Sequence, residues 1–147
     1  MAELRELSVN QFVEETASKA SVPGGGSVSA MVGALGAALM EMVANLTIGK
    51  ETYAGVQEEM QALAAEGAAL HEELLAGIKK DSESFNGYMR ALKLPKETEE
   101  EKKIRTAALQ QGLKEATEAP LAIAESAAKI FPMAETVVKL SLIHISE

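Results

Sequence analysis

One carboxylate in this sequence stands where a helix would place an apolar side chain. Asp81 follows Leu74 by seven residues and Ile78 by three, and Phe85 comes four residues later, which is the spacing of one buried helical face. Burying a carboxylate is costly unless the group is paired or used chemically. A carboxyl group partly removed from water can exchange a proton near neutral pH, which suits general acid/base catalysis. The alternative is that the helix kinks just before Asp81 and turns it into solvent.

A glycine-rich turn comes before a long apolar segment. Pro23 is followed by Gly24, Gly25 and Gly26, and Ser27 then offers a hydroxyl that could cap a helix. Backbone N–H groups at a helix N-terminus can bind an anion or stabilise a developing negative charge. The turn lacks the Gly-Lys-Ser/Thr ending of a phosphate-binding loop, and no strand precedes it. These five residues are candidate substrate-binding residues, with a tight turn between packed helices as the structural alternative.

Two smaller polar groups are weaker candidates for binding. Glu41 and Asn45 stand one helical turn apart in the apolar segment, where polar side chains need partners. They either face a pocket or satisfy one another. Lys93 and Lys96 flank Pro95 and form a local basic cluster, which would suit an anionic ligand. The alternative for these lysines is an ordinary solvated surface.

Charge and composition exclude several classes of function. The net charge of −8 argues against binding to nucleic acid or to an anionic membrane surface. The chain has no cysteine and two histidines, so thiolate catalysis is excluded and no metal site is expected. His71, beside Glu72, is predicted to be an exposed helix residue. The polar start of the chain is unlike a signal peptide, which favours a cytoplasmic location.

The spacing of apolar residues predicts helices at residues 8–20, 28–48 and 53–92 and from residue 98 onward. Ser8 with Gln11 and Thr98 with Glu101 have capping-box spacing at the first and last of these helices. We expect a kink in the long third helix, and Pro120 is expected to kink or restart the last one. Another segment is predicted to begin at Pro132.

Few aromatic residues are present, so the core must be built from small and aliphatic side chains that suit closely packed helices. Residues 28–48 are apolar nearly all round until Glu41, which predicts a helix buried on most faces or placed at a subunit interface. This segment is short for a membrane span. The predicted fold is an all-α, up-and-down helical bundle with a long, small-residue-rich central helix.

Three stretches taken together resemble one known family. In order and separation they are residues 23–28 with 33–39, residues 81–85, and residues 92–96 with 100–102 and 107–110. They resemble the cyclodeaminase/cyclohydrolase family, which comprises the C-terminal domain of formiminotransferase-cyclodeaminase and stand-alone bacterial methenyltetrahydrofolate cyclohydrolases. The resemblance extends over residues 7–138.

This resemblance implies a helical homodimer with a folate pocket near the subunit interface. No cofactor is implied beyond tetrahydrofolate as substrate and carrier. The family's acid/base aspartate corresponds to Asp81. The glycine turn would line the pocket, and Lys93 and Lys96 could meet the glutamate tail of folate.

The chain departs from the family pattern at its end. Residues 1–140 are interpreted as a helical domain of this family, but family members continue for roughly another third of their length. Residues 141–147 fit nothing expected there and are interpreted as a non-native tail, in which His144 would have no natural role. Missing helices would leave apolar surface uncovered on the helix at residues 28–48.

Three functions are compatible with these residues. The first is a formimidoyltetrahydrofolate cyclodeaminase, which joins N10 to a formimino carbon on N5 and releases ammonia. The second is a methenyltetrahydrofolate cyclohydrolase, in which water opens the methenyl bridge. The third, from another class, is a non-catalytic helical dimer or folate-binding module that uses the small-residue helix as an interface.

Overall fold

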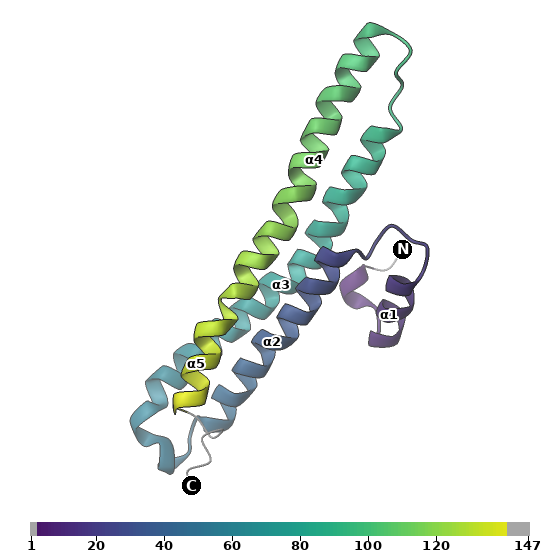
Figure 1. The fold of residues 1–147 in the computed structure, drawn as a ribbon. Helices are drawn as coiled ribbons and strands as arrows, with labels where there is room; N and C mark the ends of the chain where they lie inside the picture. The colour runs from purple at the N-terminus through teal and green to yellow at the C-terminus, as the bar shows by residue number, and fades with distance from the viewer. Residues whose placement is uncertain (1–2, 141–147) are drawn as a thin grey trace. The chain divides into compact units, whose positions relative to one another are not determined.

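The computed structural model describes residues 3–140, and helices make up most of this range. The elements in chain order are η1 (Leu4–Glu6), α1 (Val9–Ala17), α2 (Gly25–Thr47), η2 (Glu51–Val56), α3 (Gln57–Leu92), α4 (Glu99–Ala128) and α5 (Ile130–Leu140), where η marks a 3-10 helix (Figure 1). No strand occurs among these residues, so the predicted all-α class is confirmed. The predicted tail at residues 141–147, including His144, lies outside the described residues.

Both predicted capping boxes are present. At the start of α1 the Gln11 N–H donates to Ser8 Oγ at 3.3 Å, and the Ser8 N–H donates to Gln11 Oε1 at 3.0 Å. At the start of α4 the Glu101 N–H donates to Thr98 Oγ1 at 3.2 Å, and the Thr98 N–H donates to Glu101 Oε2 at 3.0 Å. Each pair satisfies N–H groups that a helix start leaves without an intrahelical acceptor.

Two predicted helix starts differ from the structure. Helix α2 begins at Gly25, and Gly24 accepts the first helical hydrogen bond from the Val28 N–H at 3.0 Å. Ser27 therefore lies inside the first turn, and the prediction that it caps the helix is wrong. Helix α3 begins at Gln57, because residues 51–56 form a 3-10 helix that is interrupted by non-helical backbone at Tyr53.

The prolines interrupt the last helices less than predicted. Helix α4 runs through Pro120 to Ala128, so the helix does not restart there. A proline inside a helix removes one backbone hydrogen bond, and a long helix packed on its neighbours can tolerate that loss. Helix α5 begins at Ile130, two residues before Pro132, after a turn in which the Lys129 N–H donates to the Ser126 carbonyl.

The chain forms two compact units, each built from separate stretches of sequence. The first contains residues up to Ser29 together with Ala76–Ala124, and the second contains Ala30–Leu75 together with the residues from Glu125 onward. In the first unit α1 buries only Phe12, while Val9 and Val13 are exposed, so its predicted apolar face is mostly uncovered. Gly112 of α4 packs closely against Tyr88 of α3 in this unit.

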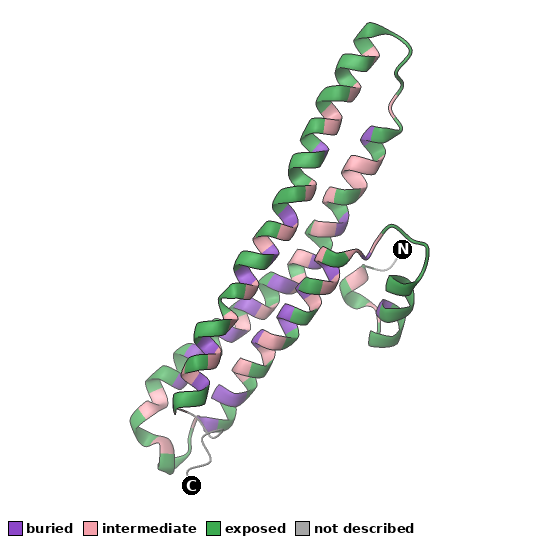
Figure 2. Ribbon diagram, viewed as in Figure 1, coloured by how far each residue is buried: buried purple, intermediate pink, exposed green. Residues whose placement is uncertain are grey.

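In the second unit the helices run up and down past one another. Gly33 of α2 faces Leu74 of α3, and Glu41, further along α2, faces Gly67, which comes earlier in α3. These two helices are therefore antiparallel, as in the predicted bundle. The core of this unit combines small α2 residues with larger aliphatic ones, and it includes Ala30, Ala34, Ala37, Ala44, Met60, Leu63, Leu70, Leu74, Met133 and Val137 (Figure 2).

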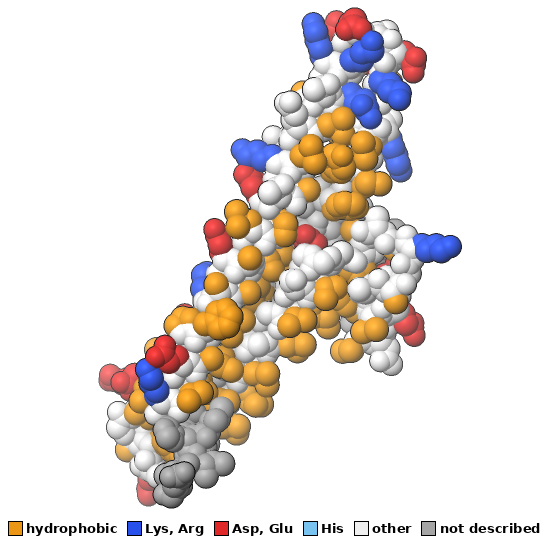
Figure 3. Space-filling model, in the orientation of Figure 1, with side chains coloured by type: hydrophobic (Ala, Val, Ile, Leu, Met, Phe, Trp, Pro, Cys, Tyr) orange, Lys and Arg blue, Asp and Glu red, His pale blue; other side chains and the backbone are white. Residues whose placement is uncertain are grey.

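The second unit buries only one side of α2. Five apolar residues on the other side, Val32, Leu35, Leu39, Met42 and Leu46, are 48–64% exposed, and Figure 3 shows apolar side chains along this helix. We call these five residues the α2 seam. Helix α2 is long and apolar enough to cross a membrane, although 39% of its most apolar 18-residue window is buried. Within the described residues α2 is therefore not buried on most faces, and its predicted placement at a subunit interface stays a prediction.

The surroundings of the polar residues in this unit also differ from those predicted. His71 is half-buried, and its Nδ1 lies 3.0 Å from Glu41 Oε2, so it is not the exposed residue that was predicted. Asn45 is exposed on α2. Glu41 thus faces His71 across α2 and α3, because the two helices approach closely where Gly67 meets Glu41.

Replacing Gly67 with Ala is expected to destabilise the fold by about 1–2 kcal/mol. The new Cβ would lie 2.9 Å from Glu41 Cβ and 3.2 Å from its backbone N and Cα, so the helices must move apart. Overpacking costs about 1–3 kcal/mol, and the helix propensity of Ala returns up to about 1 kcal/mol. Urea unfolding measures the change. Gly55→Ala is the control, since its Cβ would meet nothing within 4 Å, and equal stability of the two variants would contradict the close packing.

Part of the stability of the second unit is expected to depend on pH through Glu73. The Ser126 hydroxyl, which donates to Glu73 Oε1 at 2.5 Å, lowers the pKa of Glu73, and the Lys129 ammonium lowers it further. A carboxyl with a lowered pKa stabilises the fold above its ordinary pKa of 4.5 and loses that contribution as the pH falls through the lowered value.

Ser126→Ala is therefore expected to lower the free energy of unfolding at pH 6, and the difference from the unaltered chain is expected to shrink towards pH 3. The Glu73 side chain is 54% exposed, so the pH-dependent part should not exceed about 1 kcal/mol. Urea unfolding at several pH values measures it. A difference that stays constant with pH would mean that the hydroxyl acts by packing alone.

Candidate functional site

Asp81 lies on α3 beside the first turn of α2, within the first unit. Its carboxylate packs against Gly26, and its Oδ2 accepts a hydrogen bond of 2.8 Å from the Ser27 hydroxyl. The side chain is half-buried on a continuous helix, so the alternative of a kink that turns Asp81 into solvent is not what the structure shows. The carboxylate is therefore held against the glycine turn while part of it stays accessible.

Two buried hydroxyls lie behind this carboxylate. Ser27 is fully buried, and Ser82, the residue after Asp81, is 7% exposed. The two Oγ atoms are 3.1 Å apart. The Ser82 hydroxyl donates to the Ile78 carbonyl at 2.9 Å, and the Ser27 hydroxyl lies 3.3 Å from the same carbonyl. These contacts give each buried hydroxyl a partner, as buried polar groups require.

The glycine turn is shaped by the approach of Asp81. A Cβ at Gly26 would overlap the Asp81 carboxylate, whereas a Cβ at Gly24 or Gly25 would meet nothing within 4 Å. Gly26 is therefore the glycine that the contact requires. The carboxylate also stands at the N-terminal end of α2, where the helix dipole and the first N–H groups favour negative charge.

A pocket of about 190 Å³ opens beside Asp81. Its lining residues come from the glycine turn, α3 and α4, and they are Ser21, Gly24, Gly25, Gly26, Asp81, Ser84, Phe85 and Ala116. Phe85 was predicted on the buried face but is 36% exposed. Ser84 donates its hydroxyl to the Asp81 carbonyl at 2.8 Å. The pocket thus joins a carboxylate, the N-terminal end of a helix and an aromatic side chain.

The structure brings together only some of the predicted site residues. Pro23 is buried at the start of the turn, and Ser27 is buried behind Asp81, so neither side chain lines the pocket. Asn45, Lys93 and Lys96 are exposed and are also absent from the lining. A substrate-binding role for these residues stays a prediction.

Ser82 and Ser84 were not among the site residues predicted from the sequence. Ser82 follows Ile78 by four residues, so it occupies a buried helical position, and a hydroxyl at such a position needs a partner. That spacing was a usable signal. No comparable signal marked Ser84, because its role depends on the path of α3 past the glycine turn.

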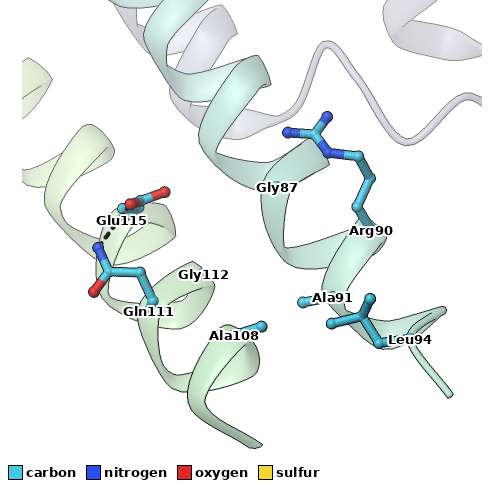
Figure 4. A pocket seen from close by; sticks show the side chains of 8 residues that line it. All are labelled: Gly87, Arg90, Ala91, Leu94, Ala108, Gln111, Gly112 and Glu115. Atoms are coloured by element: carbon cyan, nitrogen blue, oxygen red, sulfur yellow. Dashed lines mark hydrogen bonds between the residues drawn. The ribbon is translucent and has the colours of Figure 1, made fainter. Parts of the chain in front are cut away.

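A second pocket of about 320 Å³ lies between α3 and α4 of the first unit (Figure 4). Its polar side chains are Arg90, Gln111 and Glu115, and Gln111 Nε2 donates to Glu115 Oε1 at 2.7 Å. All three are exposed, so solvent screens their charges and dipoles. The smaller pocket at Asp81 is the better candidate for chemistry. No group of three or more His, Cys, Asp or Glu residues suited to a metal ion occurs in the described chain.

Comparison with known proteins identifies relatives over most of the chain. A methenyltetrahydrofolate cyclohydrolase of Methylorubrum extorquens is 38% identical, with 94% of this chain and 66% of that protein covered. A formimidoyltransferase-cyclodeaminase of Sus scrofa is 40% identical, with 82% of this chain and 22% of that protein covered. The crystal structure of a formiminotetrahydrofolate cyclodeaminase from Thermotoga maritima matches with a TM-score of 0.80 and 32% identity, over 95% of this chain and 65% of that chain.

The chain thus spans just under two thirds of the bacterial relatives named above and about a fifth of the pig protein. Residues 8–145 match the family described as formiminotransferase-cyclodeaminase. This range includes the glycine turn and Asp81, the two features that meet at the pocket. The chain belongs to the formiminotransferase-cyclodeaminase family.

Proposed function

We propose that this chain is a folate one-carbon enzyme that acts as a formimidoyltetrahydrofolate cyclodeaminase. The supporting observation is the half-buried Asp81 carboxylate, held by Ser27 and packed against Gly26 at the mouth of a pocket. A relative of similar fold bears the name formiminotetrahydrofolate cyclodeaminase. The non-catalytic binding module is the alternative that the experiment below must eliminate.

In the proposed reaction Asp81 moves one proton between two nitrogens. N10 of the substrate attacks the carbon of the protonated formimino group on N5 (N5–CH=NH2+), which gives a tetrahedral carbon bearing N5, a protonated N10 and an amino group. The Asp81 carboxylate takes the proton from N10 and delivers it to the amino group, which then leaves as ammonia. The product is 5,10-methenyltetrahydrofolate, and the carboxylate is regenerated without net proton transfer.

Methenyltetrahydrofolate cyclohydrolase is the second candidate. The relative with this name is 38% identical over 94% of the chain. Here water would add to the methenyl carbon, Asp81 would accept one proton of the water, and N5 would receive that proton as the C–N5 bond breaks. The remaining hydroxyl proton would pass to solvent, which leaves the formyl group on N10. Both reactions pass through a tetrahedral carbon between two nitrogens, so the same carboxylate can serve either one.

The other assignments in this proposal concern the rest of the substrate and its surroundings. Gly24, Gly25 and Gly26 line the pocket and would face the folate ring. Lys93 and Lys96 would meet the glutamate tail, to which their positive charges are suited. No cofactor beyond tetrahydrofolate is proposed, and the location is proposed to be cytoplasmic.

The test is a spectroscopic assay of the purified chain with 5-formiminotetrahydrofolate and methenyltetrahydrofolate offered separately. Appearance of the methenyl absorbance with ammonia release supports the cyclodeaminase, and loss of that absorbance without ammonia supports the cyclohydrolase. If neither occurs, the assay is repeated on a chain extended to the length of its bacterial relatives. If the extended chain binds tetrahydrofolate but turns over neither substrate, the binding module replaces the enzyme proposal.

The proposed homodimer would pack through the α2 seam. Its five residues follow one another at intervals of three, four, three and four, which is the spacing of a seam between paired helices. Leu39→Lys is therefore expected to convert a dimer to a monomer in sedimentation velocity, because it places a charge at the centre of the seam. Val13→Lys, on the exposed side of α1, is the control. A monomeric unaltered chain, or a dimeric Leu39→Lys chain, would contradict the proposal.

A further inference from the structure

The Ser27 hydroxyl is buried so deeply that it cannot contact a substrate, yet it contacts Asp81. Ser27 is 0% exposed, and its Oγ has three polar neighbours within 3.3 Å. They are Asp81 Oδ2 at 2.8 Å, Ser82 Oγ at 3.1 Å and the Ile78 carbonyl at 3.3 Å. Since α2 begins at Gly25, helix capping does not explain this serine. Its partners point to a role for the hydroxyl at Asp81.

When Asp81 is ionised, every hydrogen in this cluster has an acceptor. A carboxylate only accepts hydrogen bonds, so the single hydrogen of the Ser27 hydroxyl turns to Asp81 Oδ2. The Ser82 hydrogen goes to the Ile78 carbonyl at 2.9 Å. The short bond from Ser27 is charge-assisted and therefore among the stronger ones available to a serine.

When Asp81 is protonated, the hydrogen bond between Asp81 and Ser27 can reverse its direction. A carboxylic acid can donate from Oδ2 to a lone pair of Ser27 Oγ over the same 2.8 Å. The Ser27 hydrogen then turns to Ser82 Oγ at 3.1 Å, while the Ser82 hydrogen stays on the Ile78 carbonyl, which also accepts the helical Ser82 N–H. Only one O–H bond rotates, and no heavy atom needs to move.

We infer that Ser27 is a positioning residue that holds the Asp81 carboxyl in one place in both its ionised and its protonated form. A carboxylate that carries a proton from one nitrogen to another must pass through both forms without leaving its position. The Ser27 hydroxyl can change from donor to acceptor because Ser82 Oγ offers its hydrogen a second acceptor. This inference rests on the proposed acid/base function of Asp81, and it replaces the predicted substrate-binding role of Ser27.

The test combines Ser27→Ala, Asp81→Ala and the double variant in the same spectroscopic assay. Ser27→Ala is expected to lower kcat by about ten- to hundredfold, the effect of one hydrogen bond to a charged group, and to leave KM within about twofold. In the Asp81→Ala chain, Ser27→Ala is expected to cause no further loss of residual turnover. If Ser27 were merely structural, Ser27→Ala would lower turnover by the same factor in the unaltered chain and in the Asp81→Ala chain. That result would overturn the inference.

Ser126→Ala is the matched control, since Ser126 is also a buried serine that donates to a carboxylate of α3, in this case Glu73. It is expected to lower stability and leave kcat within about twofold. Full activity of Ser27→Ala beside an inactive Asp81→Ala would refute the role of Ser27 alone, whereas an active Asp81→Ala would refute the proposed function. Urea unfolding of the unaltered chain, the two single variants and the double variant tests the hydrogen bond between Ser27 and Asp81 without measuring turnover. Ser27→Ala should shift the midpoint less when Asp81 is absent, and equal shifts would contradict the hydrogen bond.

Discussion

Replacing Asp81 with Asn is expected to lower kcat by about a hundred- to ten-thousandfold while the fold is retained. Asn has nearly the same shape, and its amide oxygen can still accept from the Ser27 hydroxyl, so the packing against Gly26 survives. The amide cannot carry the proton from one nitrogen to the other, and the loss of a general acid/base group typically costs this factor. The methenyl absorbance assay measures kcat, and circular dichroism checks the fold.

Glu83→Gln is the control for this substitution, since Glu83 is an exposed carboxylate on α3 two residues after Asp81. Its kcat is expected to stay within about twofold of the unaltered chain. An Asp81→Asn chain that is as active as Glu83→Gln would remove Asp81 from the chemistry. An inactive Asp81→Asn chain that has also unfolded would require the comparison to be repeated with Asp81→Ala at lower temperature.

Adding one methyl group at Gly26 is expected to lower kcat by displacing the Asp81 carboxylate. In Gly26→Ala the new Cβ would overlap the Asp81 carboxylate, which sits on a short side chain anchored to a helix. The carboxylate or the start of α2 must move, and misplacement of a catalytic group by about 1 Å costs about a hundredfold in rate. Stability is expected to fall by about 1–2 kcal/mol, because overpacking outweighs the better helix propensity of Ala.

The neighbouring glycine provides the comparison for stability. Gly25→Ala places its Cβ where nothing lies within 4 Å, so its urea unfolding midpoint is expected to stay equal or rise slightly. The kcat of Gly26→Ala and the unfolding midpoints of both variants are measured side by side. A Gly26→Ala chain with unchanged kcat and midpoint would show that the carboxylate has room that the structure does not give it.

The sequence was most informative where a single residue contradicted its local pattern. Asp81 on an apolar helical face and three glycines after Pro23 were each visible as exceptions, and the structure places them beside one pocket. Helix class followed from the spacing of apolar residues, and the capping boxes at Ser8 and Thr98 were readable because each involves residues only three apart. Local rules therefore predicted the elements and named the two parts of the site.

Features that depend on distant contacts were not predicted. The pairing of His71 with Glu41 and the hydrogen bond from Ser27 to Asp81 join residues on different helices, and no local spacing reveals such pairs. Uncovered apolar surface was expected on this helix, but the residues of the α2 seam were not named, because an apolar segment shows that burial is favoured but not which neighbour supplies it. Ser27 shows the limit most clearly. A serine after a glycine turn is typical of a helix cap, and only its contact with Asp81 on α3 points to another role.

The two halves of the site are far apart along the chain, because Ser27 and Asp81 are separated by 54 residues. Nearly all of the intervening chain belongs to the second unit, so the first unit is itself made of two stretches connected only through the second. A single cut in η2, between Glu51 and Val56, would leave the glycine turn and its aspartate on separate polypeptides. Formation of the site would then change from loop closure within one molecule to association between two fragments, and it would depend on their concentration.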